Sequence, residues 1–236
     1  LLQRCQKEIF VGQSVVRWAK RLSFDLSDQV KMISPVAGHI PSLCEDHFLN
    51  TYPQRENFSL ASAYANSLGI SKSEFILACK DYQAQPHRLK KIHQLDEVSF
   101  WNDSKATNFD AVIAACRSMR DPVFWIGGGQ SKGGMIDEFA RELSQYIAKA
   151  FVIGEVGQEM VRKINGFSVP ATQCFSMKEA VEAAFQEANG QVSILLSPGF
   201  ASFDQFKNYN ERGNIFNQCV LELKKRFATS TQELLY

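Results

Sequence analysis

The feature that most constrains the fold is a regular alternation of short apolar segments and amphipathic segments that begins near residue 97. The apolar segments have the length of strands, and the segments between them have the periodicity of helices with one buried face. Strands are predicted at 97–101, 122–126, 149–154 and 192–196, and helices at 106–119, 135–147, 158–164, 176–188 and 203–227. Repeated strand–helix units predict an α/β fold with a doubly wound, mostly parallel, Rossmann-like sheet.

The first part of the chain follows a different pattern. Residues 1–55 are predicted to be irregular and strand-rich, with strands expected within 15–24 and 29–38. Helices are predicted at 56–70 and 71–82, where apolar residues recur at helical spacing. The change of pattern along the chain indicates two domains rather than one.

Local signals support the ends of these two helices. Gly69 is expected to end the first helix, because glycine adopts the left-handed conformation that closes helices. Ser71 is expected to cap the second helix, and Glu74 completes a capping box with it.

Pro86 interrupts the pattern between the two parts of the chain, and we place a domain boundary there. The predicted domains are therefore residues 1–85 and 86–236. His87, next to the break, is interpreted as a loop histidine whose polar atoms are satisfied.

Charge and cysteine content exclude several classes of protein. The formal net charge is +1 and no basic stripe is present, which argues against a nucleic-acid partner. No apolar run is long enough to span a membrane, and no signal peptide is recognisable. The six cysteines form no C-x-x-C pair, which is typical of reduced thiols in the cytoplasm. We therefore expect a cytoplasmic protein without nucleic-acid or membrane partners.

A glycine-rich segment follows the second predicted strand of the sheet. The segment WIGGGQSKGGM, residues 125–135, carries one lysine, Lys132. A P-loop has a glycine before its lysine and a hydroxyl residue after it, whereas Ser131 and Gly133 stand at those places here. The dinucleotide motif G-x-G-x-x-G fits only loosely. An anion site and a tight strand-to-helix turn are both compatible with this segment.

Three loops are expected at one edge of the sheet. Ligands of parallel α/β sheets bind at the carboxyl ends of the strands. That rule selects residues 102–108, 127–134 and 197–202, each of which precedes a predicted helix. Helix N-termini and the two lysines in these loops favour a small anionic ligand.

Ordinary structural roles are also open to the polar residues of these loops. Asp103 or Ser104 would serve as an N-cap for the next helix, and Ser202 would cap the last one. Lys105 and Lys132 would be solvated side chains on this interpretation.

Four motifs appear in one order and spacing: HRL at 87–89, NDSKATN at 102–108, GGGQSKGG at 127–134 and LLSPGFASFDQFKNYNERG at 195–213. Together they resemble the C-terminal domain of the D-glutamate-adding members of the Mur ligase family. The resemblance covers about residues 50–227, and residues 1–50 resemble the end of the family's central domain without a matching motif. Residues 1–85 are interpreted as the C-terminal part of that central ATP-binding α/β domain.

The resemblance implies an enzyme of cytoplasmic peptidoglycan precursor synthesis, a process on which cell shape and division depend. Such enzymes use ATP and Mg²⁺ to phosphorylate the carboxylate of a UDP-N-acetylmuramoyl-L-alanine substrate. The amine of D-glutamate then attacks the acyl phosphate, and an amide and phosphate result. The family also implies small-molecule substrates only, and a monomer.

The resemblance also implies roles for individual residues. The D-glutamate site would comprise Thr107, Lys132, Ser202, Phe203 and Tyr209, where the family has phenylalanine in place of Tyr209.

The nucleotide site implied by the resemblance comprises four residues. Asn57 would contact the adenine, while Arg88 and Asp103 would bind the ribose. Lys105 would lie near the transferred phosphate and is the expected catalytic residue.

Two departures from the family limit these expectations. Pro53–Gln54 replaces a His-Asn pair of the family just before Asn57. The phosphate loop, the magnesium-binding lysine and the UDP-binding domain have no counterpart in this sequence, so no metal ligand is expected here. We expect no ligation by this chain alone; D-glutamate-dependent phosphate release would contradict this. A non-catalytic module for an acidic ligand or nucleotide, and a ligase of the folylpolyglutamate synthase type, are the alternatives.

Overall fold

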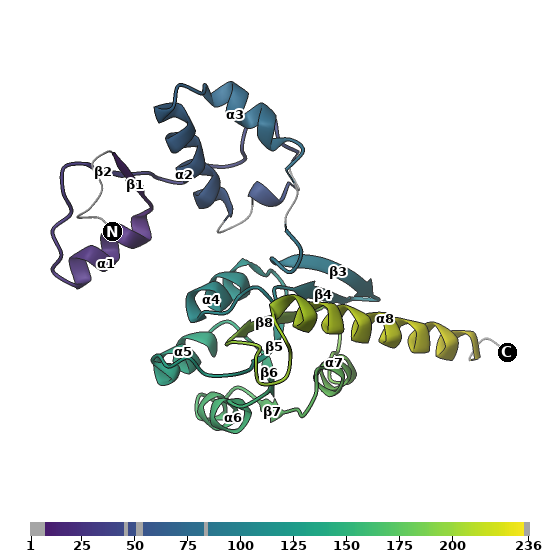
Figure 1. Ribbon diagram of the computed structural model, residues 1–236. Coiled ribbons are helices and arrows are strands. Elements are labelled where there is room, and N and C mark those ends of the chain that lie inside the picture. The colour runs from purple at the N-terminus through teal and green to yellow at the C-terminus, as the bar shows by residue number, and fades with distance from the viewer. Residues whose placement is uncertain (1–7, 45–46, 51–53, 83–84, 234–236) are drawn as a thin grey trace. The chain divides into compact units, whose positions relative to one another are not determined.

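The computed structural model describes residues 8–44, 47–50, 54–82 and 85–233. It divides the chain into two compact units, Leu1–Ala84 and Gln85–Tyr236 (Figure 1). This division lies one residue from the expected domain boundary. The identity of the first unit as part of an ATP-binding domain stays a prediction.

The second unit is built on a six-stranded sheet. Its strand order is β3 (Lys90–Leu95), β4 (Val98–Asn102), β8 (Val192–Gly199), β5 (Val123–Gly128), β6 (Lys149–Ile153) and β7 (Ala171–Gln173). All neighbouring strands are parallel except β3, which pairs antiparallel with β4. The predicted α/β class and mostly parallel sheet are confirmed. The two edge strands β3 and β7 were not predicted, because one is polar and the other has three residues.

Helices cover both faces of this sheet (Figure 1). On one face lie α4 (Phe109–Ser118), α5 (Ile136–Leu143) and α6 (Gly157–Asn165), and on the other α7 (Met177–Gln186) and α8 (Tyr209–Glu233). Each face has its own apolar core, one around Trp125 and Phe139 and the other around Phe151 and Phe216. Covering on both faces explains why every residue of β5 and β8 is buried.

The strand order brings the expected ligand loops together. The chain passes from β4 to β5 and leaves a gap that β8 fills later, so β4, β8 and β5 are adjacent. The three loops that follow these strands therefore emerge side by side at one edge of the sheet. This is a topological switch point, the usual place for a ligand in such sheets.

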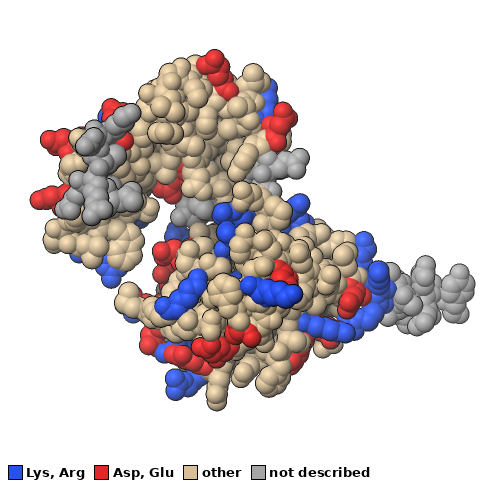
Figure 2. Space-filling model, viewed as in Figure 1, with Lys and Arg blue, Asp and Glu red and all other residues tan. Residues whose placement is uncertain are grey.

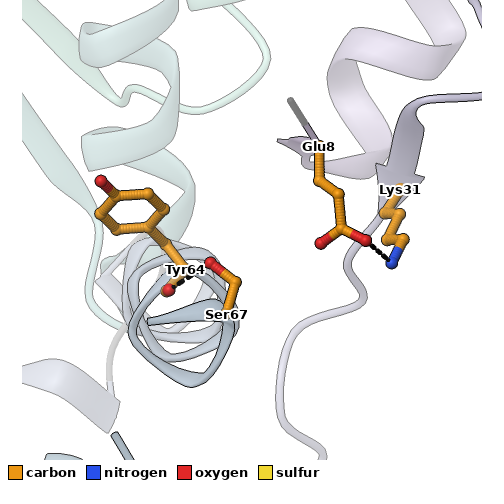
Figure 3. A network of polar contacts seen from close by, with 4 residues as sticks. All are labelled: Glu8, Lys31, Tyr64 and Ser67. Carbon is orange, nitrogen blue, oxygen red and sulfur yellow. Dashed lines mark hydrogen bonds and ion pairs between the residues drawn. The ribbon is translucent and has the colours of Figure 1, made fainter. Parts of the chain in front are cut away.

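The first unit is smaller, and its longest elements are helices. It contains β1 (Ile9–Val11), α1 (Gln13–Arg21), β2 (Val30–Met32), the 3₁₀ helix η2 (Phe48–Asn50), α2 (Gln54–Ser67) and α3 (Lys72–Cys79). β1 and β2 form a parallel pair, and an ion pair joins Lys31 of β2 to Glu8 beside β1 (Figure 3). In the last turn of α2, the Ser67 hydroxyl donates to the carbonyl of Tyr64 at 2.7 Å (Figure 3). A small core gathers Ile40, Leu49, Phe58 and Ile76.

One prediction for the first unit is wrong and another is confirmed. The strand expected within 15–24 is the helix α1, whose polar and apolar residues separate onto two faces despite the Val15–Val16 pair. The capping box is present: the Ser71 hydroxyl accepts from the Glu74 amide at 3.3 Å, and the Glu74 carboxylate accepts from the Ser71 amide at 2.9 Å.

The structure shows neither a surface of one charge on the face in view (Figure 2) nor a helix suited to a membrane among the described residues. Basic and acidic side chains are mixed over the visible face of the molecule (Figure 2). Within the described ranges, no helix combines the length and the apolar character that crossing a membrane requires.

Candidate functional site

The loops after β5 and β8 are joined by backbone hydrogen bonds. The Gln130 amide donates to the carbonyl of Ala201 at 2.9 Å, and the Ala201 amide donates to the carbonyl of Gln130 at 3.1 Å. This two-residue antiparallel bridge extends beyond the ends of both strands. It holds the two loops in a fixed register at the edge of the sheet.

The glycines at the end of β5 are explained by close backbone packing. Gly128 and Gly129 have φ angles of +107° and +132°, which side chains rarely adopt. A Cβ atom at Gly129 would lie 2.1 Å from the carbonyl oxygen of Ala201, and one at Gly128 equally close, at 2.1 Å, to that of Ile153. For these two glycines the tight-turn interpretation is therefore sufficient.

The later part of the same loop forms a pocket with the loop after β4. The Lys132 ammonium donates to the Thr107 carbonyl at 3.4 Å, so two residues predicted to share a site are brought together. A cavity of about 290 Å³ lies beside them and is lined by Thr107, Asn108, Phe109, Lys132, Gly133, Gly134, Gly199 and Phe200. Lys132 is exposed, and its long bond leaves the ammonium able to reach an anion in the cavity.

The segment after β8 forms a turn before the last helix. The Ser202 carbonyl accepts from the amides of Gln205 at 3.3 Å and Phe206 at 2.8 Å. Within the described residues, the amides of Ser202, Phe203 and Asp204 have no acceptor. Ser202 is buried whereas 68% of Phe203 is exposed. Three consecutive N–H groups without an acceptor, at the start of a turn, are available as donors to an anion.

The predicted helix caps at this edge are wrong. Helix α4 is capped by Asn108, whose side-chain oxygen accepts from the Ala111 amide at 2.9 Å, and not by Asp103 or Ser104. At the start of α8, Asn208 accepts from the Glu211 amide at 2.9 Å in the way expected of Ser202. Both helices begin later than predicted, so the loops before them are longer and their polar residues are available for other contacts.

Asp103 is buried at the end of β4, with 8% of its surface exposed. Its Oδ1 accepts from the Leu89 amide at 3.0 Å and its Oδ2 from the Ser197 hydroxyl at 2.9 Å. Burial raises the pKa of Asp103 to about 7, although these hydrogen bonds and the charge of Arg88 oppose the shift. A carboxylate has room for further donors, so Asp103 can still accept from a ligand hydroxyl.

A tight bend places Arg88 next to Asp103. The residues on either side of it, His87 and Leu89, have left-handed φ angles of +61° and +44°. The His87 carbonyl accepts from the Lys105 amide at 3.0 Å, which fixes the bend to the loop after β4. The side chain of Arg88 is exposed and its Nε donates to Gln85 at 3.3 Å.

The interpretation of His87 as a satisfied loop histidine is wrong. Only 6% of its surface is exposed, and its Nδ1 has no hydrogen-bond partner. The ring packs against Gly213 of α8, where a Cβ atom would lie 2.3 Å from Nδ1. Burial lowers the pKa of His87, so the neutral ring is favoured.

Lys105 and Tyr209 meet at the start of α8. The Lys105 ammonium lies 3.8 Å from the centroid of the Tyr209 ring, a cation–π contact. The Tyr209 carbonyl accepts from the Ser104 hydroxyl at 2.8 Å, which holds the backbone under this ring. Hydrogen bonding to Lys105 lowers the pKa of the Tyr209 hydroxyl.

Sequence reasoning missed Arg212, which has no exposed surface and is bonded to the loops after β4 and β8. A signal for it was present. Arg212 stands on the same helical stripe as Phe216, Val220 and Leu223, all of which are buried. A charged residue at a core position of a helix points to a specific buried partner.

Asn57 is the predicted site residue that belongs to the first unit, so its contact with the nucleotide stays a prediction. It lies on α2 in the first unit, is exposed, and donates to the Gln54 side chain at 3.3 Å. Gln54 belongs to the pair that departs from the family, while Pro53 lies outside the described residues. In the described parts of the chain, no three or more His, Cys, Asp or Glu residues group together as a metal site would require.

Comparison with known sequences identifies relatives that match most of the chain. Residues 87–200 match the family described as Mur ligase, glutamate ligase domain. The UDP-N-acetylmuramoylalanine–D-glutamate ligase of Caldanaerobacter subterraneus subsp. tengcongensis is 33% identical over 184 residues, which are 77% of this chain and 41% of that relative. The ligase of the same name from Chlamydia caviae is 36% identical over 171 residues, which are 72% of this chain and 41% of that relative. The chain thus spans about two fifths of the relatives' length.

Solved structures share the fold at low identity. A folylpolyglutamate synthase of Mycobacterium tuberculosis, complexed with ADP and AMPPCP, superposes with a TM-score of 0.57 at 13% identity, over 79% of this chain and 49% of that one. The UDP-N-acetylmuramate-alanine ligase of Thermotoga maritima gives a TM-score of 0.55 at 13% identity, over 76% of this chain and 39% of that one. The family match over residues 87–200 and the identities of the sequence relatives show that this part of the chain belongs to the Mur ligase family, glutamate ligase domain.

Proposed function

We propose that this chain supplies the D-glutamate-binding part of an ATP-dependent ligase that joins D-glutamate to UDP-N-acetylmuramoyl-L-alanine. The observation that carries the proposal is the pocket where Lys132 meets Thr107, in the same group of loops as the free N–H groups of 202–204. The relatives named UDP-N-acetylmuramoylalanine–D-glutamate ligase are 33–36% identical over most of the chain, and they support the choice of substrates.

The acceptor amino acid has two carboxylates, and the loops offer two kinds of anion site. The Lys132 ammonium and Thr107 would hold one carboxylate, and the turn at Ser202 and Phe203 would hold the other. Tyr209 would provide a flat wall beside them. Holding both ends of D-glutamate leaves the α-amine free to attack, and such positioning is the main source of rate in this kind of reaction.

The nucleotide would lie at the other end of the loop after β4. Asp103 keeps acceptor capacity for a ribose hydroxyl, and Arg88 beside it would contribute a second polar contact. Lys105, on the same loop, would face the phosphate that is transferred. Its ammonium would stabilise negative charge on the phosphoryl oxygens.

The proposed reaction proceeds in two steps. ATP, with Mg²⁺, supplies the phosphoryl group that activates the carboxylate of the muramoyl-alanine substrate. The amine of D-glutamate then adds to the acyl carbon, the C–O bond to phosphate breaks, and the amine loses a proton as the amide forms. Residues of this chain would orient the amine and offset charge; magnesium ligands and the UDP-sugar site are not assigned to it.

The proposal is tested by titrating the isotopically labelled chain with D-glutamate and, separately, with L-glutamate, followed by NMR. We expect saturable shifts for residues 105–108, 130–134 and 200–204 with D-glutamate, and their loss in Lys132→Ala. Lys178→Ala, which removes an exposed lysine of α7, is the matched control and is expected to behave as the wild type.

Two results would contradict the proposal. Preference for L-glutamate would favour a ligase of the folylpolyglutamate synthase type, whose fold is similar. Nucleotide binding without binding of either amino acid would favour a nucleotide-binding module.

A further inference from the structure

A buried arginine joins the loops of the proposed site, and the proposed chemistry gives it no role. Arg212 lies near the start of α8 and is 0% exposed. Its Nε donates to the Ser104 hydroxyl at 3.1 Å, and its Nη2 to the Ser104 carbonyl at 2.9 Å. Its Nη1 donates to the Phe200 carbonyl at 3.2 Å. One guanidinium therefore spans the loop after β4 and the loop after β8.

Ser104 extends this connection to the beginning of α8. It is fully buried, and its hydroxyl donates to the Tyr209 carbonyl while accepting from Arg212. Ser104 stands between Asp103 and Lys105 in the chain. Arg212 and Ser104 thus connect the loop after β4, which carries the expected nucleotide contacts, to the backbone that precedes Ser202.

The charge of Arg212 is not neutralised by a direct ion pair. Its three acceptors are two carbonyls and a hydroxyl, and within the described residues no carboxylate forms an ion pair with it. Burial lowers the pKa of Arg212 to about 10, against the opposing charge of Asp204, so the side chain stays protonated near pH 7. The Asp204 carboxylate accepts from the Glu155 amide at 2.8 Å.

A buried cation of this kind is a poor way to gain stability alone. Removing a charge from water is costly, and well-packed apolar residues often stabilise a core at least as much. The planar guanidinium does provide several donors at fixed angles, which an ammonium cannot. Positioning of the two loops and a positive electrostatic potential beside them explain the presence of Arg212 better than a contribution to stability does.

We propose that Arg212 is a positioning residue of the ligase. It holds the loop that carries Lys105 and the loop that carries Ser202 in one fixed arrangement, which we call the frame. Its unpaired positive charge also makes this edge of the sheet more attractive to an anionic substrate. The purpose that we give to the frame, which is to bind D-glutamate, rests on the proposed function. The frame itself is tested without any substrate.

The first experiment compares amide NMR spectra of the full 236-residue chain as wild type, Arg212→Lys and Val220→Ala. Val220→Ala is the control, because it removes buried volume from the same helix away from the loops. In Arg212→Lys we expect the signals of Lys105, Ser202 and Asn210 to shift together while those of β6 stay in place. In the control the loop signals are expected to remain unchanged at a similar loss of melting temperature.

The second experiment measures affinity for D-glutamate. Arg212→Lys is expected to weaken it by about tenfold, the loss of roughly one charge-assisted hydrogen bond, and Val220→Ala by less than about twofold. In Arg212→Ala, added guanidinium is expected to restore affinity, whereas methylammonium at the same ionic strength is not.

The outcomes separate this proposal from the function on which it rests. A destabilised Arg212→Lys with unchanged loop signals and affinity would make Arg212 purely structural and overturn the proposal. Failure of the wild type to bind D-glutamate, with the loop signals still shifting together in Arg212→Lys, would reject the function but support the frame.

Discussion

The ammonium of Lys105 lies 3.8 Å from the centroid of the Tyr209 ring. Lys105 lies in the loop after β4, and Tyr209 is the first residue of α8. The contact orients the lysine that is expected to face the phosphate. It also gives the tyrosine, where the resembled family has phenylalanine, a role for its aromatic face.

The first prediction concerns this ring. Tyr209→Phe is expected to keep the position of Lys105, because a cation–π contact needs the aromatic face and not the hydroxyl. Tyr209→Leu is expected to release it, at a cost of about 0.5–1 kcal/mol. The measurement is the ring-current shift of the Lys105 Cε protons, which should be upfield in the wild type and Tyr209→Phe and disappear in Tyr209→Leu. An equal shift in all three proteins would rule the contact out.

The second prediction concerns the pH dependence of stability through Asp103. Its folded-state pKa is raised from 3.8 to about 7, so the neutral carboxyl is favoured in the folded chain. The associated stability is present below the unfolded pKa near 3.8 and is lost as the pH rises through about 7. Between pH 4 and 8 the loss is expected to be on the order of 2–4 kcal/mol, set by the pKa difference.

Urea unfolding at a series of pH values checks this, with Asp103→Asn as the comparison. The variant cannot ionise, so its stability should vary less over the same range. A carboxyl ¹³C signal of Asp103 that titrates near 4 would show that burial does not raise its pKa. A ligand hydroxyl requires an acceptor, so nucleotide affinity should move in the opposite direction and fall as the pH drops below 7.

Whether a feature can be predicted from the sequence depends on how far apart in the chain the interacting residues lie. The capping box of Ser71 and Glu74 was predictable, since it requires residues three positions apart. The grouping of three loops at one edge of the sheet was predictable from the alternation of elements and a general rule about parallel sheets. Thr107 and Lys132 were assigned to one site from the family resemblance, and the structure brings them together.

Features that depend on distant partners were not predictable. Arg212 bonds to Ser104 across 108 positions, and no local pattern names that partner. Ser202 has the sequence context of an N-cap, but the chain after it forms a separate turn, and the residue that caps α8 is Asn208. In α1, two β-branched residues suggested a strand where amphipathic spacing decided for a helix.

The third prediction concerns the cap of α4. Asn108→Ala removes the acceptor for the Ala111 amide and is expected to cost about 1 kcal/mol. Asn108→Asp keeps an acceptor and adds a favourable charge at the helix N-terminus, so it should be near neutral. Urea unfolding of the three proteins measures the difference. An equal loss for both variants would place the importance of Asn108 in the adjoining pocket rather than in the cap.

The last prediction uses two glycines of the loop after β5. A methyl group at Gly129 would lie 2.1 Å from the Ala201 carbonyl, and the backbone there has a φ of +132°. Gly129→Ala must therefore break the bridge to Ala201 or distort β8. Gly133 also has a positive φ, +82°, but open space surrounds its Cβ position. Gly133→Ala should cost only the strain of that conformation, about 1 kcal/mol.

We expect Gly129→Ala to lose several kcal/mol, as other overpacked backbone sites do. Its amide spectrum should change at both 130 and 201, because the two loops are fixed through one pair of hydrogen bonds. Hydrogen exchange of the Gln130 and Ala201 amides reports the same event directly and should accelerate only in Gly129→Ala. Equal effects of the two substitutions on stability and exchange would mean that the glycines serve the turn alone, and that the bridge does not couple the loop after β5 to the loop after β8.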